Sequence, residues 1–212
     1  MATDRVTISR ILKVNHAGEY GAIRIYRAQL WVARRIYPEI ATFLEETLAH
    51  ELRHCAMFRA AMSERGVRPC RIMSLWGNGG LMLGLFTSCL GRQGVWICTA
   101  AVEGAVHRHL EEQLHFLRGK DDNLHSLILS IQREELDHLS HAEARLTSRA
   151  AWARLLNGLI TACTDAVIWL STWGTSSKMV SELAAARSAA AHVGNIRATT
   201  SSPSARATEV RG

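Results

Sequence analysis

The sequence is poor in residues that interrupt helices, with only three prolines among 212 residues. Its five cysteines are odd in number and no two are spaced as Cys-x-x-Cys, which argues against a disulfide framework and against a zinc ribbon. The chain has no block of Lys and Arg interleaved with aromatic residues, so no nucleic-acid partner is predicted. Its first residues form no apolar run, and we expect no secretory signal.

The remaining composition is that of a folded helical protein. Ala, Leu, Arg and Glu are abundant, 48% of the residues are hydrophobic and 21% are charged. A chain of this length is expected to form one domain with a sizeable core. Unpaired cysteines are typical of a cytosolic protein, and the diffuse net charge of +6 is compatible with contact to an anionic membrane surface.

Helical periodicity predicts four long helices, over 6–35, 38–65, 92–118 and 121–147. The links within the first pair and within the second pair are very short, so each pair must form an antiparallel hairpin. The link between the pairs, 67–91, is long. An all-α, ferritin-like four-helix bundle has this one long crossover between its second and third helices.

The crossover itself is unusual because no residue from Ile72 to Gly91 is charged. Its length is borderline for crossing a bilayer, and its glycines and Asn78 argue against a transmembrane helix. Two interpretations stay open. The segment is either buried across the bundle or lies as a wedge in the membrane interface.

A further apolar helix is expected over 150–173, and Asp165 is the only charge in its apolar part. The tryptophans at its ends are typical of a membrane boundary, although a fifth helix packed on the bundle would fit equally well. Beyond it the chain is rich in Ala, Ser, Thr and Arg. We therefore expect a bundle domain over 1–175 and a poorly ordered tail over 176–212, with at most a marginal helix at 178–192.

Two Glu-x-x-His steps and two further glutamates repeat along the chain at one common offset. The separation in sequence from Glu19 to Glu103 equals that from Glu51 to Glu135 and from His54 to His138, as if two copies of a helix pair each supplied half of a site. These six residues are Glu19, Glu51, His54, Glu103, Glu135 and His138. One glutamate from each of two helices, with Glu-x-x-His from each of two others, is the ligand set of a dinuclear metal site in a four-helix bundle.

All four glutamates fall on the apolar faces of their helices. Glu51 shares a stripe with Leu44 and Phe58, and Glu135 shares one with Ile128. An unpaired carboxylate in a core costs several kcal/mol or takes up a proton. No stripe of Lys or Arg on these faces supplies the compensating charge, whereas two divalent metals would.

Carboxylate oxygens with few imidazoles indicate iron or manganese and not a structural zinc. Bundle geometry predicts that Glu51 and Glu135 bridge the two metals. Glu19 and Glu103 would then be terminal ligands, and His54 and His138 would each cap one metal. Positions left open would accept O2 for a two-electron oxidation in a water-poor pocket.

Other residues of the same types need to be separated from this set. A third Glu-x-x-His step, Glu112/His115, has no counterpart at the common offset and points to the opposite side of its helix, so we assign it to solvent. His50 faces away from Glu51 and receives no role. Three histidines are candidates to support the ligands from behind: His16, His107 and His109. For His107 a position at the surface is the alternative.

Four segments resemble the demethoxyubiquinone hydroxylase family of di-iron monooxygenases. They are Val-Asn-His-Ala-Gly-Glu-Tyr-Gly-Ala at 14–22, His-Glu-Leu-Arg-His at 50–54, Ala-Val-Glu at 101–103 and Glu-Glu-Leu-Asp-His at 134–138. The resemblance spans about 5–173. The first segment is specific, whereas the Glu-x-x-His steps are common to ferritin-like carboxylate proteins. Two positions depart from the family pattern: many members have His-Tyr at His109-Leu110, and Glu-Glu at Glu103-Gly104.

The resemblance implies an enzyme that uses O2 to hydroxylate the ring of a polyprenylated demethoxybenzoquinol in ubiquinone biosynthesis. It implies two iron ions at the six residues above, and a peripheral protein on the cytoplasmic side of the cell inner membrane. It identifies neither the electron donor nor the prenyl length, and it leaves both a monomer and a homo-oligomer open.

Two other functions remain as alternatives. One is a soluble ferritin-like oxidoreductase of the rubrerythrin or peroxidase kind, which would need no lipid-facing surface. The other is a non-catalytic accessory protein that binds metal or quinone, for which the bundle would serve as a scaffold.

Overall fold

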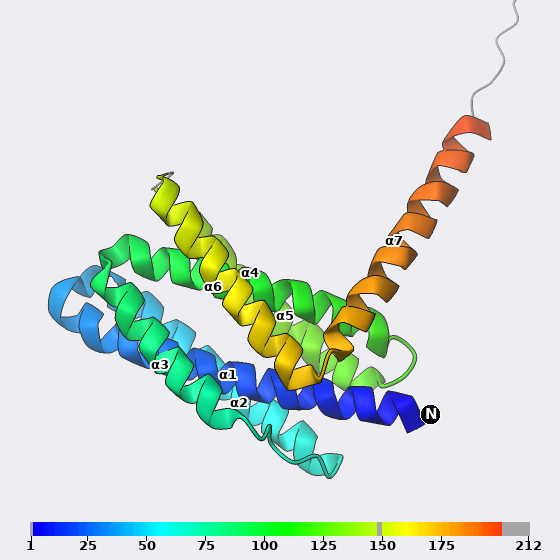
Figure 1. Cartoon of the computed structure of the whole chain (residues 1–212), viewed down its shortest axis with the longest axis horizontal. Coiled ribbons are helices and arrows are strands. Elements are labelled where there is room, and N and C mark those ends of the chain that lie inside the picture. The colour runs from blue at the N-terminus through cyan, green and yellow to red at the C-terminus, as the bar shows by residue number, and fades with distance from the viewer. Residues whose placement is uncertain (1, 148–149, 201–212) are drawn as a thin grey trace, which may run out of the picture.

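A computed structural model describes residues 2–147 and 150–200 of the chain, and within these ranges it is all-α, without a strand (Figure 1). The helices are α1 (Ala2–Ile36), α2 (Ala41–Glu64), α3 (Met73–Cys89), α4 (Gly91–Leu117), α5 (Asp122–Glu143), α6 (Ala151–Thr172) and α7 (Thr175–Thr200), with a short 3₁₀ turn η1 (Pro38–Ile40) before α2. The fifth predicted helix is thus α6, and the crossover contains α3.

Helices α1, α2, α4 and α5 form the predicted ferritin-like bundle, and the prediction of its fold class is confirmed. Short links make antiparallel hairpins of α1 with α2 and of α4 with α5. At the second link Gly119 adopts a left-handed φ of 69°, and the Asp121 carboxylate accepts a hydrogen bond from the Leu124 amide at 2.9 Å, which caps α5. The helix predicted over 121–147 ends earlier, at Glu143.

The bundle core consists of two apolar clusters, one toward each end of the helices. One contains Ile11, Leu12, Phe58, Leu110 and Ile128, among others. The second contains Tyr26, Leu44, Val95, Trp96 and Ala142, among others. Along every one of the four bundle helices, the predicted metal ligands lie between a residue of the first cluster and a residue of the second. Apolar packing on both sides therefore holds the middle of the bundle in place.

Helix α3 packs closely along α1 because glycine lets the two backbones approach. A Cβ on Gly80 would lie 2.4 Å from the Gly21 carbonyl oxygen, and one on Gly84 would lie 2.5 Å from that of Ile25. The opposite edge of α3 exposes large apolar side chains: Leu75, Met82 and Phe86. The crossover therefore has one buried edge and one exposed apolar edge, which combines features of both interpretations left open by the sequence.

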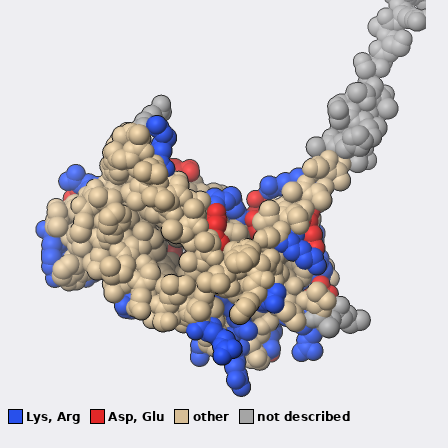
Figure 2. Space-filling view, viewed as in Figure 1, with Lys and Arg blue, Asp and Glu red and all other residues tan. Residues whose placement is uncertain are grey.

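Helix α6 lies against α4 and α1, with much of its surface uncovered. Exposed side chains on it are Trp152, Leu155, Leu159, Trp169 and Leu170. Among the described helices α6 alone is long and apolar enough to cross a membrane, judged only by length and composition, and 22% of its apolar window is buried. Figure 2 shows the face that α3 and α6 share as a largely uncharged surface with Lys and Arg toward its edges.

Helix α7 occupies part of the region where the sequence predicted a poorly ordered tail. It follows a left-handed turn at Trp173 and Gly174, buries Ser176 and Met179 against the body, and then projects away from the bundle (Figure 1). The Ala-rich segment has few large hydrophobic side chains, and for that reason the sequence predicted a poorly ordered tail. Alanine also has high helix propensity, which accounts for the helix that is found instead. Residues 201–212 lie outside the described part, and the division into a bundle over 1–175 and a separate tail stays a prediction.

Candidate metal centre

The six residues selected by the internal repeat meet at mid-length in the bundle, and all of them are buried. Their exposed fractions are 6% for Glu19, 1% for Glu51, 0% for His54, 2% for Glu103, 1% for Glu135 and 5% for His138. Helix α1 supplies the first, α2 the next two, α4 the fourth and α5 the last two.

Their oxygen and nitrogen atoms form two overlapping groups, and within each group the ligand atoms lie within 4.8 Å of one another. The first group is Glu19, Glu51, His54 and Glu135, and the second is Glu51, Glu103, Glu135 and His138. The two groups share Glu51 and Glu135. This sharing is what two bridging carboxylates require, while the role of the six residues as metal ligands stays a proposal.

Both histidines direct Nδ1 into the cluster. His54 Nδ1 lies 2.9 Å from Glu135 Oε1 and 3.8 Å from Glu19 Oε2. His138 Nδ1 lies 3.2 Å from Glu135 Oε2 and 3.7 Å from Glu51 Oε1. Nδ1 is therefore the nitrogen that each histidine would offer to a metal.

The opposite ring nitrogens are held from behind by two residues that sequence reasoning missed. His54 Nε2 lies 3.2 Å from Glu134 Oε2, a carboxylate that Arg53 also contacts, and His138 Nε2 lies 3.0 Å from His50 Nδ1. A partner on the outer nitrogen fixes the orientation of a metal-binding imidazole. The signal was available, because His50 and Glu134 are themselves related by the offset that relates the ligands.

The carboxylates of the cluster lie close enough to shift one another's pKa values. Burial, and then the charge of Glu135, raise the pKa of Glu19 to about 7. Burial and neighbouring carboxylates also raise the pKa values of Glu51 and Glu103 well above the usual range. Burial alone would raise the pKa of Glu135 too, but His138 and His54, whose Nδ1 atoms face its two oxygens, hold it at about 2.

These properties fit a site for two divalent cations. In the described part of the chain no Lys or Arg forms an ion pair with any of the four carboxylates. Glu51 Oε1 is buried and accepts no hydrogen bond from a described residue. Buried hydrogen-bond acceptors without a donor cost free energy unless a cation binds to them. The oxygen and nitrogen atoms of the cluster therefore suit a bound metal.

An apolar cavity of about 420 Å³ leads to the cluster from the side of α3 and α6. Four of the residues in its wall are the glutamates Glu19, Glu51, Glu103 and Glu135. The rest of the wall is largely apolar, and includes Ile25, Leu83, Phe86, Val102, Leu156 and Ile160 from α1, α3, α4 and α6. The face in Figure 2 is hollowed between α3 and α6, where the Trp76 indole donates a hydrogen bond to Ser171 Oγ at 3.0 Å.

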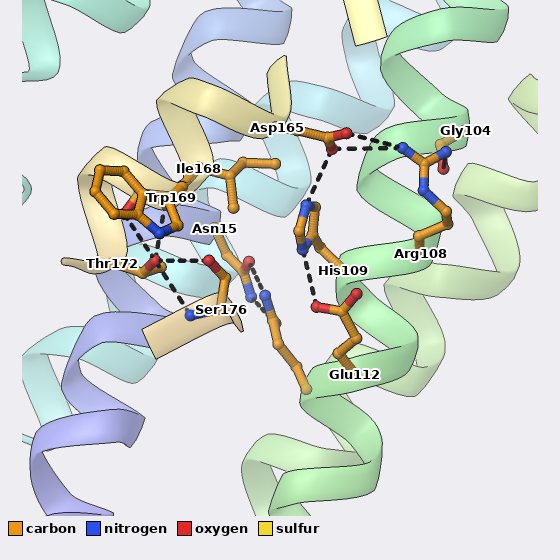
Figure 3. A network of polar contacts seen from close by, with 11 residues as sticks. Asn15, Gly104, Arg108, His109, Glu112, Asp165, Ile168, Trp169, Thr172 and Ser176 are labelled. Carbon is orange, nitrogen blue, oxygen red and sulfur yellow. Dashed lines mark hydrogen bonds and ion pairs between the residues drawn. The ribbon is translucent and has the colours of Figure 1, made fainter. Parts of the chain in front are cut away.

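Polar side chains also lie in the cavity wall, and Figure 3 shows the surroundings of two of them, Asn15 and His109. Asn15 and Gln113 pair through reciprocal amide hydrogen bonds of 2.7 and 3.0 Å. His109 lies between two carboxylates, with Nδ1 3.0 Å from Glu112 Oε2 and Nε2 3.1 Å from Asp165 Oδ1.

The described contacts join none of the three candidate supporting histidines to a proposed ligand. His16 is buried and His107 is half-buried, and Nδ1 of each has no described hydrogen-bond partner. The assignment of Glu112 to solvent was wrong, since Glu112 is 8% exposed. Periodicity correctly turned it away from the ligands, but α4 is covered on that side too, by α6 and α7.

The chain is similar to known proteins of ubiquinone biosynthesis. The family profile described as "Ubiquinone biosynthesis protein COQ7" matches residues 6–171. A 3-demethoxyubiquinol 3-hydroxylase of Rhodospirillum rubrum is 35% identical over 164 residues, which cover 77% of each chain. The mitochondrial NADPH-dependent 3-demethoxyubiquinone 3-hydroxylase of Mus musculus is 35% identical over 176 residues, 79% of this chain and 78% of the relative. That of Dictyostelium discoideum is 32% identical over 171 residues, again 79% and 78%.

Proposed function

The chain belongs to the COQ7 family of ubiquinone biosynthesis proteins, and we propose that it uses O2 to hydroxylate the ring of a polyprenylated demethoxybenzoquinol at a di-iron site. Its relatives in bacteria and in mitochondria are named as hydroxylases of demethoxyubiquinol or demethoxyubiquinone. The observation that carries the proposal is the apolar cavity whose wall contains all four glutamates of the cluster. A ring placed there would lie beside the atoms that hold the metal.

Two iron ions per chain are the metals that this donor set favours, because carboxylate oxygens with two imidazoles suit redox-active iron. Glu51 and Glu135 belong to both groups of ligand atoms and would hold both metals. Glu19 with His54, and Glu103 with His138, would complete the two sides. Bound iron would supply the two-electron activation of O2 that ring hydroxylation needs.

The chain's own residues prepare the site by orienting ligands and excluding water. Glu134 and His50 hold the outer nitrogens of the two histidines, and the Tyr26 hydroxyl donates to Glu103. Burial, followed by the charge of Glu103, keeps the pKa of Tyr26 well above its usual range, so this phenol stays a donor. The apolar wall around the glutamates keeps bulk water from the reacting ring.

The substrate's polyprenyl tail accounts for the apolar surface around the cavity. A tail that leaves between α3 and α6 would reach apolar side chains that these helices expose: Leu75, Phe86, Leu155 and Leu159. These two helices share the largely uncharged face in Figure 2. We infer that this face rests on the cytoplasmic side of the inner membrane as a peripheral contact. A soluble rubrerythrin-like enzyme would have no use for such a face, and a non-catalytic accessory protein would not need a cavity that reaches the metal.

Quinone analysis in a bacterial strain without its own demethoxyubiquinol hydroxylase tests the proposal. Wild-type protein should convert the accumulated demethoxy precursor to ubiquinone, and Glu135→Ala should leave the precursor unconverted at equal protein level. Glu143→Ala, an exposed change on the same helix, is the matched control and should behave as wild type. Wild-type protein that is folded and iron-loaded but leaves the precursor unchanged would refute the proposed activity and favour the accessory role.

A further inference from the structure

Helix α6 forms one wall of the cavity although few of its side chains are buried. Of its 22 residues the buried ones are Ala153, Ile160, Ile168, Ser171 and Thr172. Apolar packing on the bundle is therefore a weak constraint on its position. Polar contacts must therefore contribute much of what fixes the position of this wall. Asp165, the only charged residue in the apolar part of α6, makes such contacts.

That charge, Asp165, reaches across to two consecutive residues of α4 (Figure 3). Its Oδ1 lies 3.1 Å from His109 Nε2, and its two oxygens lie 3.4 and 3.3 Å from Arg108 Nη2. Arg108 is itself fixed by a hydrogen bond from Nη1 to the Gly104 carbonyl at 2.9 Å. The contact thus joins α6 to a stretch of α4 that begins one residue after Glu103.

The contacts of Asp165 with Arg108 and with His109 are both ionic. An ionised carboxylate only accepts hydrogen bonds. While Asp165 and Glu112 are both ionised, the two ring nitrogens of His109 that face them therefore both carry hydrogen. His109 is then an imidazolium, and with Arg108 it balances the two carboxylates. The His109 side chain is 14% exposed, whereas those of Asp165 and Arg108 are 42% and 51% exposed, so the contact with His109 is the better shielded from water.

We propose that Asp165 is a positioning residue, which holds α6 as a wall of the cavity through Arg108 and His109 and so sets how well the cavity retains a long apolar tail. Thr164 and Ile168, on either side of Asp165 in α6, both line the cavity, so a displacement of this segment moves the wall. The hydrogen bond between Ser171 and Trp76 ties the next turn of α6 to α3. The inference rests on the proposed function for the identity of the tail alone.

Hydrogen exchange of the full-length, metal-loaded protein tests the positional claim without any turnover. Asp165→Asn keeps the shape of the side chain and removes its charge, and amides over 159–170 should exchange about tenfold faster than in wild type. Glu45→Gln is the matched control: Glu45 is 47% exposed, similar to Asp165 at 42%, and pairs with Arg34 at 2.7 Å away from the cavity. It should leave α6 unchanged. Exchange in Asp165→Asn equal to wild type would overturn the proposal.

Steady-state kinetics with two substrates tests the consequence for the tail. With a long-tailed demethoxyquinol, Asp165→Asn should raise KM about tenfold and change kcat little; with a short-tailed analogue, both constants should stay near wild type. Equal losses on both substrates would overturn the retention claim. If wild type itself turns over neither quinol, the proposed function fails, while the exchange experiment still decides the position of α6.

An exchange of charges separates the contact from a general loss of folding. Asp165→Arg places a third cation beside Arg108 and His109, and should speed exchange in α6 more than Asp165→Asn does. Combining it with Arg108→Asp restores opposite charges and should return most of the protection. A double variant that is no better protected than Asp165→Arg alone would count against the contact as the cause.

Discussion

The hydroxyl of Tyr26 on α1 donates a hydrogen bond to Oε1 of Glu103 on α4, and so one half of the internal repeat supports the proposed ligand of the other half. The repeat relates Tyr26 to Leu110, since each follows its own glutamate, Glu19 or Glu103, by two turns of helix. Leu110 has no donor to offer to Glu19. The two sides of the candidate metal centre are therefore chemically unequal.

This inequality predicts that Tyr26→Phe weakens metal binding on the Glu103 side. Loss of a residue that supports a metal ligand typically costs about 10- to 100-fold in metal affinity or activity, and a fall in iron affinity near the lower end of that range is expected. Competition with a chelator, followed by metal analysis, measures it. Tyr20→Phe, a change on the exposed side of the same helix, should have no effect, and equal iron retention by both variants would contradict the role of Tyr26.

The support that crosses between α2 and α5 gives a second prediction. His50 contacts His138, and Glu134 contacts His54, so each half of the repeat again holds the histidine of the other. Glu134→Gln should lower iron affinity by about tenfold or more, because an amide holds the imidazole proton less firmly than a carboxylate. The same chelator competition applies, and the exposed Glu143→Gln on α5 is expected to match wild type.

The pKa values of the cluster predict how pH affects the metal-free chain. The pKa of Glu19 is raised from 4.5 to about 7, so the folded chain binds more protons than the unfolded chain in between. Glu19 therefore contributes on the order of 3 kcal/mol at most to the free energy of unfolding below about pH 4.5. This contribution is lost as the pH rises through about 7. Burial lowers the pKa of His54, but its contact with Glu135 and the charges of Glu19 and Glu135 outweigh burial and raise this pKa, which acts in the same direction.

Denaturant unfolding of the metal-free protein should therefore show lower stability at pH 7.5 than at pH 5.5. The iron-loaded protein should lose less over the same interval, because bound cations replace the protons on the carboxylates. Metal-free stability that rises with pH across this interval would show that Glu19 is not held protonated in the folded chain.

The close approach of α3 to α1 gives a prediction with a control in the same helix. A Cβ at Gly84 would lie 2.5 Å from the Ile25 carbonyl oxygen and 2.9 Å from the Ala28 Cβ, so Gly84→Ala should cost about 1–3 kcal/mol of unfolding free energy. Gly79 has nothing within 4 Å of its added Cβ, and Gly79→Ala should be neutral or stabilising by up to about 1 kcal/mol. Thermal or denaturant unfolding compares the two variants. Equal stability of both would mean that the two helices are not packed backbone to backbone.

The sequence was most informative where one physical rule governs a whole helix. The 3.6-residue period defines each bundle helix, and the common offset picks out Glu51 and Glu135 from the unrelated Glu112. Periodicity gives the direction of a side chain but not what covers it, which is why Glu112 was assigned to solvent. Periodicity also cannot show that α3 packs on α1. Gly80 and Gly84 permit another helix to approach closely, but they do not indicate which helix it is.

Contacts between distant residues were the other part that the sequence could not give. Asp165 looked like an isolated charge in an apolar helix, and its partners Arg108 and His109 become visible only once α6 lies along α4. His50 and Glu134 were a different case, because the repeat relates them. Their contacts cross from one helix to another, however, and a rule that considers one helix face at a time passes over them.

The exposed apolar side chains of α6 predict a measurable affinity for lipid. Leu155 and Leu159 are 64% and 55% exposed, and each would bury much of that surface on a bilayer, for about 1 kcal/mol or more per side chain. Changing both to serine should weaken co-sedimentation with phospholipid vesicles by at least about tenfold. Leu136 on α5 has a similar exposure of 45% but belongs to no part of the uncharged face, so Leu136→Ser is the control and should bind as wild type. Equal binding by all three proteins would remove α6 from the membrane contact, and the proposed path of the substrate's tail between α3 and α6 would have to be abandoned with it.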